Sequence, residues 1–187
     1  MTPGPADDEF GAHLDEVLIG GREALTVVIA DHDPAWRDRF ESEQQRIAEA
    51  LGAVARRIDH IGSTSVPGLA AKPIIDIQVG VDHPQDPAEI VPPLEAAGYV
   101  LRVQEPDHVM LRTLERDVHI HVWLLDPADE ARHLTLRDWL RAHPEDRQAY
   151  EDLKRELSRQ EWDDMNYYAR AKGELINEIL ERATGGK

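Results

Sequence analysis

The residue types with the clearest chemistry lie in residues 60–79, where a glycine–hydroxyl loop, a lysine and a carboxylate occur within twenty residues. The loop reads Gly62-Ser63-Thr64-Ser65. Glycine allows the backbone to approach a ligand closely, and the three hydroxyl groups are donors for phosphate oxygens. The alternative is an ordinary turn, since glycine and serine are common turn residues. Because a lysine and an aspartate follow so closely, we favour a phosphate-binding loop.

Lys72 and Asp76 lie at the entrance to an apolar strand predicted over residues 74–81. Lys72 precedes Pro73, which favours extended backbone, and its ammonium group can act as a point charge against phosphate; a solvated lysine is the alternative. Asp76 stands within a run of isoleucines, where a carboxylate is costly to bury without a compensating partner. We therefore predict a metal-binding or catalytic role for Asp76, with a structural salt bridge as the alternative.

Two histidines on a later predicted strand complete a candidate metal site. His119 and His121 project from the same face of that strand, because side chains alternate with a period of two. Imidazole nitrogens suit divalent transition metals, whereas carboxylate oxygens suit Mg²⁺ or Mn²⁺. Together with Asp76 they predict a three-ligand divalent metal site, with Mg²⁺ or Mn²⁺ expected and Zn²⁺ as an alternative. The other interpretation is two polar residues on a face of the sheet.

Three further side chains are candidates for the same site. His60, at the end of the strand before the loop, is predicted as a general base, and an interaction with the neighbouring aspartate or with a carbonyl is the alternative. Lys154 and Lys172 each follow a tyrosine by four residues (Tyr150 and Tyr168), so each pair shares a helix face. Such a face can present a lysine to phosphate while the tyrosine flanks a base. The alternative is an amphipathic helix whose lysine stem extends over the core.

Composition limits the class of protein. With 187 residues, of which 41% are hydrophobic and 31% charged, the chain is long enough for one globular domain with a substantial core. The absence of cysteine excludes disulfides and thiolate chemistry. The net charge of -16 argues against nucleic acid or an anionic membrane as a partner. With no long apolar window and no signal pattern, a cytoplasmic protein is expected. The sequence does not indicate an oligomeric state.

The order of the predicted elements indicates the fold class. Residues 1–23 are predicted as a flexible acidic tail with at most a helical turn over 12–19. A single domain follows over residues 24–187, with a sheet core to about residue 126 and a helical part over about 127–184. Strands are predicted over 25–30, 53–61, 74–81, 99–103, 109–114 and 117–125, and helices over 34–51, 88–97, 134–142, 146–159 and 167–183. This order predicts an α+β fold with a C-terminal helical layer rather than a doubly wound repeat.

Several separated segments resemble the GrpB family, which is also found as the C-terminal domain of some dephospho-CoA kinases. The segments are residues 60–79, Asp33-Pro-Ala-Trp36, Gly98-Tyr99, His119-Ile-His121-Val, residues 136–141, Tyr150-x-x-x-Lys154 and Tyr168-x-x-x-Lys172. They occur in the right order and cover roughly residues 25–183. The resemblance implies a nucleotidyltransferase-like fold, in which a mixed sheet is flanked by helices.

The resemblance also implies roles for particular residues. In nucleotidyltransferase-like proteins a Gly-Ser pair contacts the triphosphate, while two carboxylates one residue apart and a third on a later strand bind two Mg²⁺ ions. Gly62-Ser63 and Asp76 match the Gly-Ser pair and the first carboxylate. Gln78 stands where the second carboxylate is expected, and the later strand offers His119 and His121 in place of an acid. These departures argue against ordinary two-metal nucleotidyl transfer.

We therefore predict a metal-dependent transferase that uses a nucleoside triphosphate as co-substrate and passes a nucleotidyl or phosphoryl group to a small-molecule acceptor. The predicted residues are Asp76, His121 and His60 for catalysis; Gly62, Ser63, Thr64, Ser65, Lys72, Lys154 and Lys172 for phosphate binding; and Asp76, His119 and His121 for the metal. The rival is a non-catalytic nucleotide- or CoA-binding module that regulates or chaperones a partner, which Gln78 favours. Metal-dependent hydrolysis through the histidines, without a nucleotide, is a third possibility.

Overall fold

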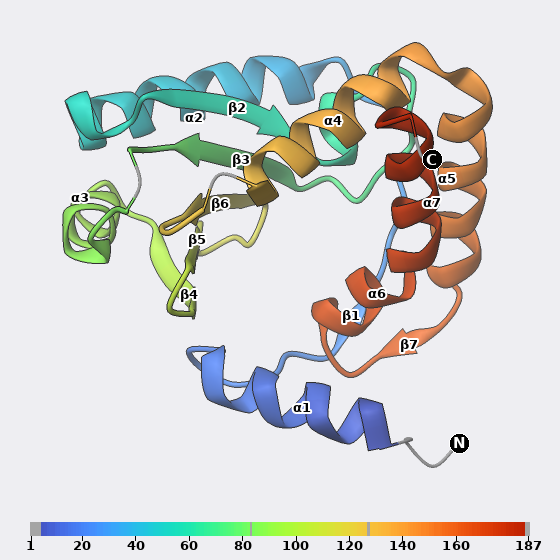
Figure 1. Cartoon of the computed structure of the whole chain (residues 1–187), viewed down its shortest axis with the longest axis horizontal. Coiled ribbons are helices and arrows are strands. Elements are labelled where there is room, and N and C mark those ends of the chain that lie inside the picture. The colour runs from blue at the N-terminus through green and yellow to red at the C-terminus, as the bar shows by residue number, and fades with distance from the viewer. Residues whose placement is uncertain (1–4, 83, 127, 186–187) are drawn as a thin grey trace.

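A five-stranded sheet organises the computed structural model, which describes residues 5–82, 84–126 and 128–185. The strands run in the spatial order β2 (Arg57–Ile61), β3 (Ile75–Gly80), β6 (Val118–Trp123), β5 (His108–Arg112) and β4 (Val100–Gln104). Strands β3 and β6 are parallel, whereas each of the other neighbouring pairs is antiparallel. The α+β fold with a mixed sheet that the sequence and its resemblance predicted is thus confirmed (Figure 1).

One face of the sheet is covered by α2 (Ala35–Leu51) and α3 (Val91–Ala96). Their apolar side chains, including Trp36 and Ile47 from α2 and Leu94 from α3, form the main core with Ile75 and Ile77 of β3. The start of α2 matches the sequence signal, since the side chain of the preceding aspartate accepts a hydrogen bond from the backbone near the first turn. This face of the sheet therefore supplies stability through apolar burial.

The opposite face of the sheet is polar. In β3 the apolar Ile75, Ile77 and Val79 alternate with Asp76 and Gln78, as the period of two in a strand requires. The sheet thus buries its isoleucines and valine under α2 and α3 and turns its carboxylate and amide the other way. The side chains of chemical interest lie on this second face.

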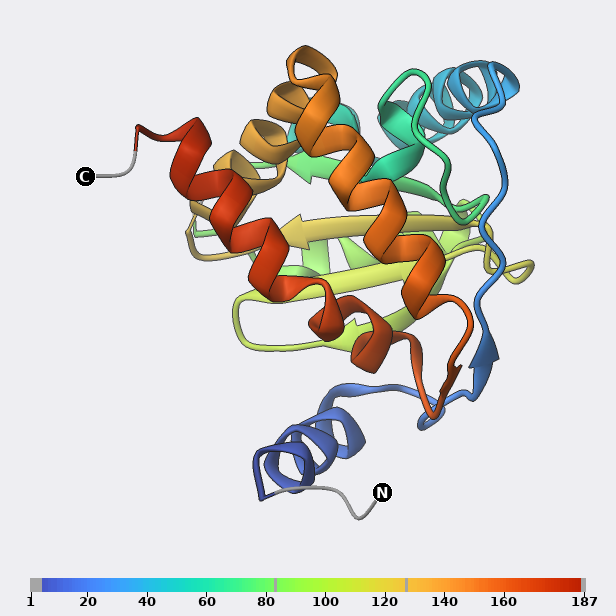
Figure 2. The ribbon, with the colours of Figure 1, turned by 90° about the vertical axis from the view of Figure 1, so that its right-hand side faces the viewer.

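A layer of C-terminal helices stands over that polar face (Figure 2). It consists of α4 (Ala128–Ala142), α5 (Pro144–Leu157), α6 (Met165–Ala171) and α7 (Gly173–Ala183). Leu140, Tyr150 and Ile179 from this layer pack against Val66 and Leu69, which follow the glycine–hydroxyl loop. The layer is therefore fastened to the loop, and α4 also contacts the strands directly, since Arg137 donates to the carbonyl of His60 and Gln78 donates to that of Glu130.

Some predicted boundaries differ from the structure. Of the strand predicted over 25–30, only β1 (Leu25–Thr26) forms, and it pairs with β7 (Glu161–Trp162) in a separate two-stranded sheet. The helix predicted over 167–183 divides into α6 and α7 at Lys172. The described residues also form three short 3-10 helices, namely η1 (Gly52–Val54), η2 (Ser63–Ser65) and η3 (Pro87–Glu89). These differences arise from tertiary pairing and local backbone geometry, which single-segment patterns do not encode.

The acidic N-terminal segment contains a helix, α1 (Pro5–Val17), where a flexible tail with one helical turn was predicted. Val17 and Leu18 lie three and four residues after Leu14, so the three side chains share one face at the end of the helix, and this face packs against Val103 of β4. This apolar stripe outweighs the acidic composition on which the prediction of a tail was based. Residues 1–4 of the predicted tail lie outside the described residues.

Candidate metal and phosphate site

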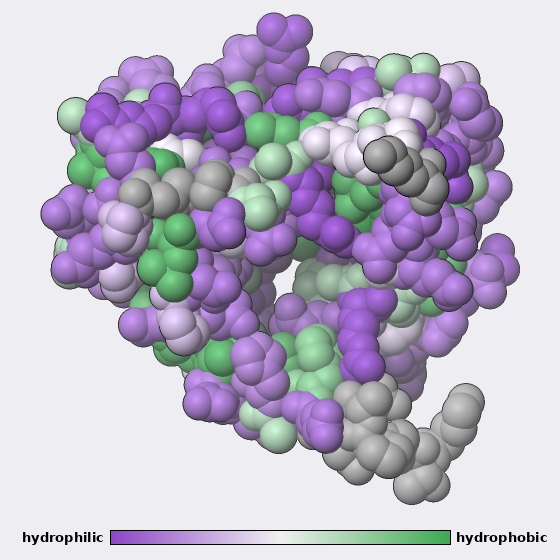
Figure 3. Space-filling model, viewed as in Figure 1, coloured by the Kyte–Doolittle hydropathy of each residue, from purple (hydrophilic) through white to green (hydrophobic). Residues whose placement is uncertain are grey.

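A cavity of about 730 Å³ lies between the polar face of the sheet, the η2 loop, the C-terminal helices and the segment after α1. Figure 3, viewed from the same side as Figure 1, shows a deep opening near the middle of the molecule. Eight basic side chains line the cavity (Lys72, Arg102, Arg112, Arg116, Arg132, Arg137, Lys154 and Lys172), against five acidic ones (Glu23, Asp76, Glu115, Asp117 and Asp164). Although the net charge of the whole chain is -16, the cavity therefore has more positive than negative side chains and should attract anions.

Asp76, His119 and His121 converge on the cavity wall. Each offers one ligand atom, and these atoms all lie within 4.8 Å of one another. The Oδ1 atom of Asp76 is 3.4 Å from Nδ1 of His119, because the parallel register places the two residues side by side on β3 and β6. Ligand atoms bound to one ion at about 2.0–2.3 Å lie roughly 3–4.6 Å apart, so the spacing fits a single divalent ion.

The environment of Asp76 keeps its carboxylate ionised. Burial opposes ionisation, but the hydrogen-bonding contact with His119 and the positive charge of Lys72 outweigh it and lower the pKa of Asp76 to about 2. About 31% of the side chain remains open to the cavity. The carboxylate is therefore both charged and accessible, as a metal ligand must be.

A second set of side chains holds His121 in position. Its Nδ1 lies 3.2 Å from Nε2 of His108, whose Nδ1 lies 3.1 Å from Glu105. His13 of α1 reaches the other oxygen of Glu105 at 2.9 Å. Such chains of imidazoles and carboxylates orient metal-binding histidines in proteins and leave the other ring nitrogen for the ion. Burial, with the neighbouring His108, keeps the pKa of His121 well below its usual value, so its ring is neutral as metal binding requires.

The glycine–hydroxyl loop lies directly beside the metal cluster. Gly62 has φ of +68°, and a β-carbon at this position would collide with the Asp76 carboxylate. Gly62, Ser63 and Thr64 line the cavity. The Thr64 hydroxyl donates to the carbonyl of Ile74 (3.0 Å) and the Ser65 hydroxyl donates to that of Gly62 (2.6 Å). These two hydroxyls therefore fix the turn, and Ser63 lines the cavity beside them.

His60 lies apart from the candidate metal cluster. Its ring stacks on Phe40 of α2 with a centroid distance of 4.7 Å, and its Nε2 is 3.0 Å from the Thr64 hydroxyl. It pairs in register with Ile77, which faces the apolar core, and it does not line the cavity. Burial lowers the pKa of His60 to about 4. These contacts do not support the general-base role predicted for His60.

Three lysines from separate segments meet around two tyrosine rings. The Nζ atoms of Lys72 and Lys172 lie 4.8 Å and 4.7 Å from the ring centroid of Tyr168, and that of Lys154 lies 4.9 Å from the ring centroid of Tyr150. Among the described residues, no carboxylate lies within salt-bridge distance of these ammonium groups. Lys154 is only 2% exposed and donates to the carbonyl of Ala70, so its stem does not reach out to solvent.

The lysines repel one another in a poorly solvated place. Burial, followed by the charge of Lys172, lowers the pKa of Lys72 and of Lys154 to about 7. Among the described residues these three ammonium groups have no salt-bridge partner, so an anion bound at this end of the cavity would relieve their mutual repulsion. The phosphate-binding prediction for these lysines thus gains a geometric basis, although the sequence did not reveal that they share two rings.

Gln78, which stands where a second carboxylate was expected, is fully buried. Its Nε2 donates weakly to the carbonyl of Glu130 at 3.4 Å, and within the described part of the chain its Oε1 has no hydrogen-bond partner. It shares the face of β3 that carries Asp76, but it does not line the cavity. A second negative ligand is therefore missing beside Asp76.

Sequence reasoning missed the residues that support and surround the site. Glu105 and His108 lie behind the candidate metal cluster, and the arginines on the cavity wall were not among the predicted site residues. Arg112 could have been predicted from its cross-strand neighbour, because it pairs in register with His119. That pairing requires the hairpin register, which the sequence pattern left open.

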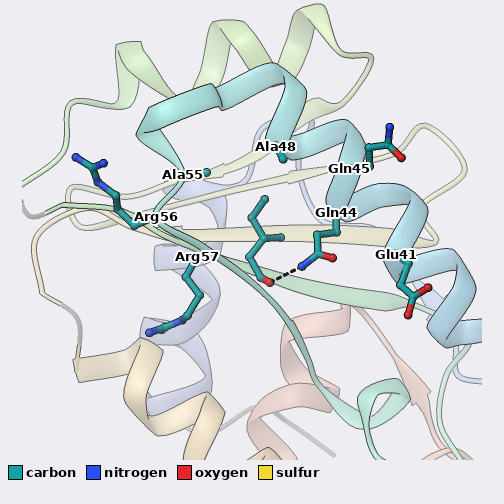
Figure 4. A pocket seen from close by; sticks show the side chains of 8 residues that line it. Glu41, Gln44, Gln45, Ala48, Ala55, Arg56 and Arg57 are labelled. Atoms are coloured by element: carbon teal, nitrogen blue, oxygen red, sulfur yellow. Dashed lines mark hydrogen bonds between the residues drawn. The ribbon is translucent and has the colours of Figure 1, made fainter.

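A second hollow, of about 600 Å³, lies between α2 and β2 (Figure 4). Glu41, Gln44 and Gln45 line it from the helix, and Arg56 and Arg57 line it from the strand side. The Gln44 side chain donates to the carbonyl of Ile58 at 3.1 Å and so occupies part of the strand's outer edge. None of the predicted site residues lies in this hollow.

The mixed sheet, the glycine–hydroxyl loop and the carboxylate on the next strand are consistent with the nucleotidyltransferase-like superfamily. The family model described as GrpB protein matches residues 26–182, and the chain belongs to the GrpB family. The crystal structure of conserved protein GrpB from Enterococcus faecalis superposes with a TM-score of 0.69 at 31% identity, covering 83% of this chain and 96% of that one.

Sequence relatives agree with this placement. A UPF0157 protein of Streptomyces coelicolor is 48% identical, covering 89% of both chains, and one of Halalkalibacterium halodurans is 40% identical over 96% of this chain and 93% of its own. A dephospho-CoA kinase of Mycolicibacterium paratuberculosis is 31% identical over 81% of this chain but only 44% of the kinase. Within the described residues, no helix combines the length and apolar character needed to cross a membrane.

Proposed function

We propose that this protein is a metal-dependent transferase that uses a nucleoside triphosphate and passes a nucleotidyl or phosphoryl group to a small acceptor. The observation that carries the proposal is the meeting of two features in one cavity: the Asp76, His119 and His121 cluster, and the lysine cluster of Lys72, Lys154 and Lys172. The cavity volume of about 730 Å³ is within the range of small-molecule sites.

The donor set bears on which ion the site would take. Two imidazole nitrogens and one carboxylate suit Mn²⁺ or Zn²⁺ better than Mg²⁺, which prefers oxygen ligands and keeps several waters. Asp76, His119 and His121 would hold the ion, and a bound divalent cation would supply charge neutralisation for phosphate oxygens. We therefore propose Mn²⁺ before Mg²⁺, with Zn²⁺ as the alternative.

The remaining residues of the site position the phosphates. Gly62 leaves room for the Asp76 carboxylate, and Ser63 presents a hydroxyl to the cavity. Lys72, Lys154 and Lys172 would hold phosphate oxygens by charge, while the rings of Tyr150 and Tyr168 keep the ammonium groups together. Positioning and charge stabilisation are the main protein contributions to phosphoryl-type transfer, so this arrangement fits the reaction class.

A thermal-shift experiment tests the proposal. ATP with Mn²⁺ at a hundred times its Kd should stabilise the protein by about 2.7 kcal/mol, which is roughly 5–10 °C in Tm for a chain of this size. Asp76→Asn should abolish this stabilisation, whereas Asp107→Asn, at an exposed position, should retain it. Under turnover, release of pyrophosphate indicates nucleotidyl transfer and release of ADP indicates phosphoryl transfer.

The second candidate is a non-catalytic module that binds a nucleotide or CoA and regulates a partner. The neutral, buried Gln78 favours it, because the site lacks a second carboxylate. The similarity to part of a dephospho-CoA kinase is a further reason to keep it. ATP binding that needs no metal and survives Asp76→Asn would support this module over the transferase. No stabilisation by any nucleotide would contradict both.

A further inference from the structure

A cluster of arginines on the cavity wall is closed by one carboxylate from the segment after α1. The Nη1 and Nη2 atoms of Arg112 donate to the two oxygens of Glu23 at 2.9 Å and 2.8 Å. Arg116 approaches the same carboxylate at 3.1 Å. This is the two-pronged geometry by which a guanidinium recognises a planar carboxylate.

The third member of the cluster, Arg102, is buried. Its side chain is 5% exposed, and its nearest carboxylate, Asp164, lies 3.7 Å away. Asp164 is already engaged by the backbone amides of Glu23 and Asn166, both at 2.9 Å. Three guanidinium groups thus share two carboxylates, and without Glu23 they would be left with a marked excess of positive charge. The arginines, Arg112 foremost, hold the pKa of Glu23 at about 2.

The backbone at Arg116 adopts a left-handed conformation at the end of the turn between β5 and β6. Among the described residues, it is the one non-glycine position with positive φ (+63°). This left-handed conformation usually belongs to glycine or asparagine, and an L side chain there costs about 1 kcal/mol or more. The strained turn between β5 and β6 keeps an arginine that reaches Glu23. The turn thereby places the Arg116 guanidinium 3.1 Å from the Glu23 carboxylate.

The arginine cluster and the candidate metal cluster share one face of the sheet. Arg112 pairs in register with His119, which pairs in turn with Asp76, so the three lie on neighbouring strands about 4.8 Å apart. The lysines, by contrast, belong to the loop and the helical layer. An acceptor held by the arginines would therefore lie on the sheet side of the same cavity, opposite the lysines.

The segment that carries Glu23 is held to the domain on both sides of this residue, since the backbone amide of Ile19 donates to the carbonyl of Arg102 and Leu25 pairs with Trp162. Displacement of Glu23 from the arginines is therefore a movement of its side chain. Gly20 and Gly21, with φ of +88° and +75°, separate α1 from Glu23. The match to the family model begins at residue 26, three residues after Glu23. The Glu23 carboxylate is seated against the arginines as an anion would be.

We propose that Arg102, Arg112 and Arg116 form the acceptor subsite, that the acceptor carries a carboxylate, and that Glu23 occupies the subsite as an internal stand-in until the acceptor displaces it. The acceptor role rests on the proposed transferase function, whereas carboxylate binding by the arginines does not. The carboxylate of an acceptor would make the contacts that the Glu23 carboxylate now makes with Arg112 and Arg116.

The test measures malonate binding by the full chain at constant ionic strength, without nucleotide or metal. Glu23→Gln keeps the side-chain shape but removes the competing charge, and it should bind malonate at least tenfold more tightly than the wild type. Glu16→Gln removes an equal charge from an exposed position on α1 and should change nothing. Malonate should also shift the guanidinium NMR signals of Arg112 in Glu23→Gln.

A second variant guards against poor folding of Glu23→Gln. Arg116→Gly relieves the left-handed strain, so it should fold at least as stably as the wild type while binding malonate more weakly. Equal malonate affinity in Glu23→Gln and Glu16→Gln, or an unchanged affinity in Arg116→Gly, would overturn the subsite. A gain for inorganic phosphate but not for malonate in Glu23→Gln would overturn the carboxylate assignment.

The two proposals fail in different ways. Malonate binding that behaves as expected, in a protein that no ATP–metal mixture stabilises, would refute the transferase and leave the carboxylate site standing. ATP–Mn²⁺ stabilisation lost in Asp76→Asn, with no effect of Glu23→Gln on malonate, would do the reverse.

Discussion

Gly62 shows how a single residue couples the loop to the candidate metal cluster. Its φ of +68° already favours glycine, and the space where a β-carbon would stand is filled by the Asp76 carboxylate. Gly68, in the same connection, has φ of +78° but nothing within 4 Å of its missing β-carbon. A side chain at Gly68 would therefore meet backbone strain alone, whereas a side chain at Gly62 would meet backbone strain and a steric conflict with Asp76.

Replacing each of these glycines with alanine should give different results. Gly68→Ala should lower the free energy of unfolding by about 1–2 kcal/mol through backbone strain alone. Gly62→Ala should lose more, because the methyl group must displace Asp76, and it should also weaken Mn²⁺ binding by at least tenfold. Urea unfolding and metal titration measure the two effects. Equal losses in both variants, with Mn²⁺ binding intact, would contradict the steric role of Gly62.

At the scale of elements, α1 is held by a small apolar contact. Leu14 is 3% exposed and packs with Val17, Leu18 and Val103, whereas Ile19, just past the helix, is 46% exposed. The docking of this helix closes the cavity on the side of the Glu23 segment. Its stability should therefore depend on few side chains.

Truncating Leu14 tests this dependence. Leu14→Ala should reduce the free energy of docking by about 2–5 kcal/mol, the usual range for a buried leucine, while Ile19→Ala should have little effect. Hydrogen exchange should show faster amide exchange over residues 5–17, with the sheet protected as before. Loss of protection in β3 and β6 would instead mean that α1 is part of the main cooperative unit.

The elements also show what the sequence could and could not predict. The α+β class, α2 and the alternation in β3 follow from local patterns, because burial on one face imposes a period of two on a strand. The sequence pattern did not predict the full length of α1, because its apolar residues, among them Leu14 and Val17, stand among acidic ones. The two-residue β1 depends on its pairing with β7, over a hundred residues away, which no local pattern records.

How much of the candidate site could be predicted depends on how far apart its residues lie in the chain. Asp76 stood out from its own neighbours, and the shared face of His119 and His121 follows from strand geometry alone. The meeting of Lys72 with Lys172, and of Arg112 with Glu23, depends on the packing of whole layers. Predicting those contacts requires the register of the sheet and the position of the helices.

At the scale of the whole molecule, the convergence of three lysines gives anion binding a pH dependence. In the free protein the pKa of Lys72 and of Lys154 is about 7, lowered first by burial and then by the charge of Lys172. A bound anion favours the protonated lysines, so binding takes up protons and affinity must fall as the pH rises through 7. For each such lysine the fall between pH 6 and pH 8 is about tenfold.

Sulfate is a suitable probe because its charge is constant over this range. Titration calorimetry should show affinity falling by about a hundredfold from pH 6 to pH 8 in the wild type, and by about tenfold in Lys154→Met. Proton uptake should be visible as a dependence of the measured heat on the buffer. An affinity that is level or that rises with pH would contradict the idea that these lysines hold the anion.

The single parallel pair in the sheet also governs how the molecule assembles. Asp76 and the two histidines come from β3 and β6, which are more than forty residues apart along the chain, and α3, β4 and β5 lie between them. Contacts of such sequence separation form slowly, because a long loop must close before they stabilise anything. In a refolding experiment, the capture of a divalent ion should therefore be among the last signals to develop, and its kinetics would time the completion of the sheet.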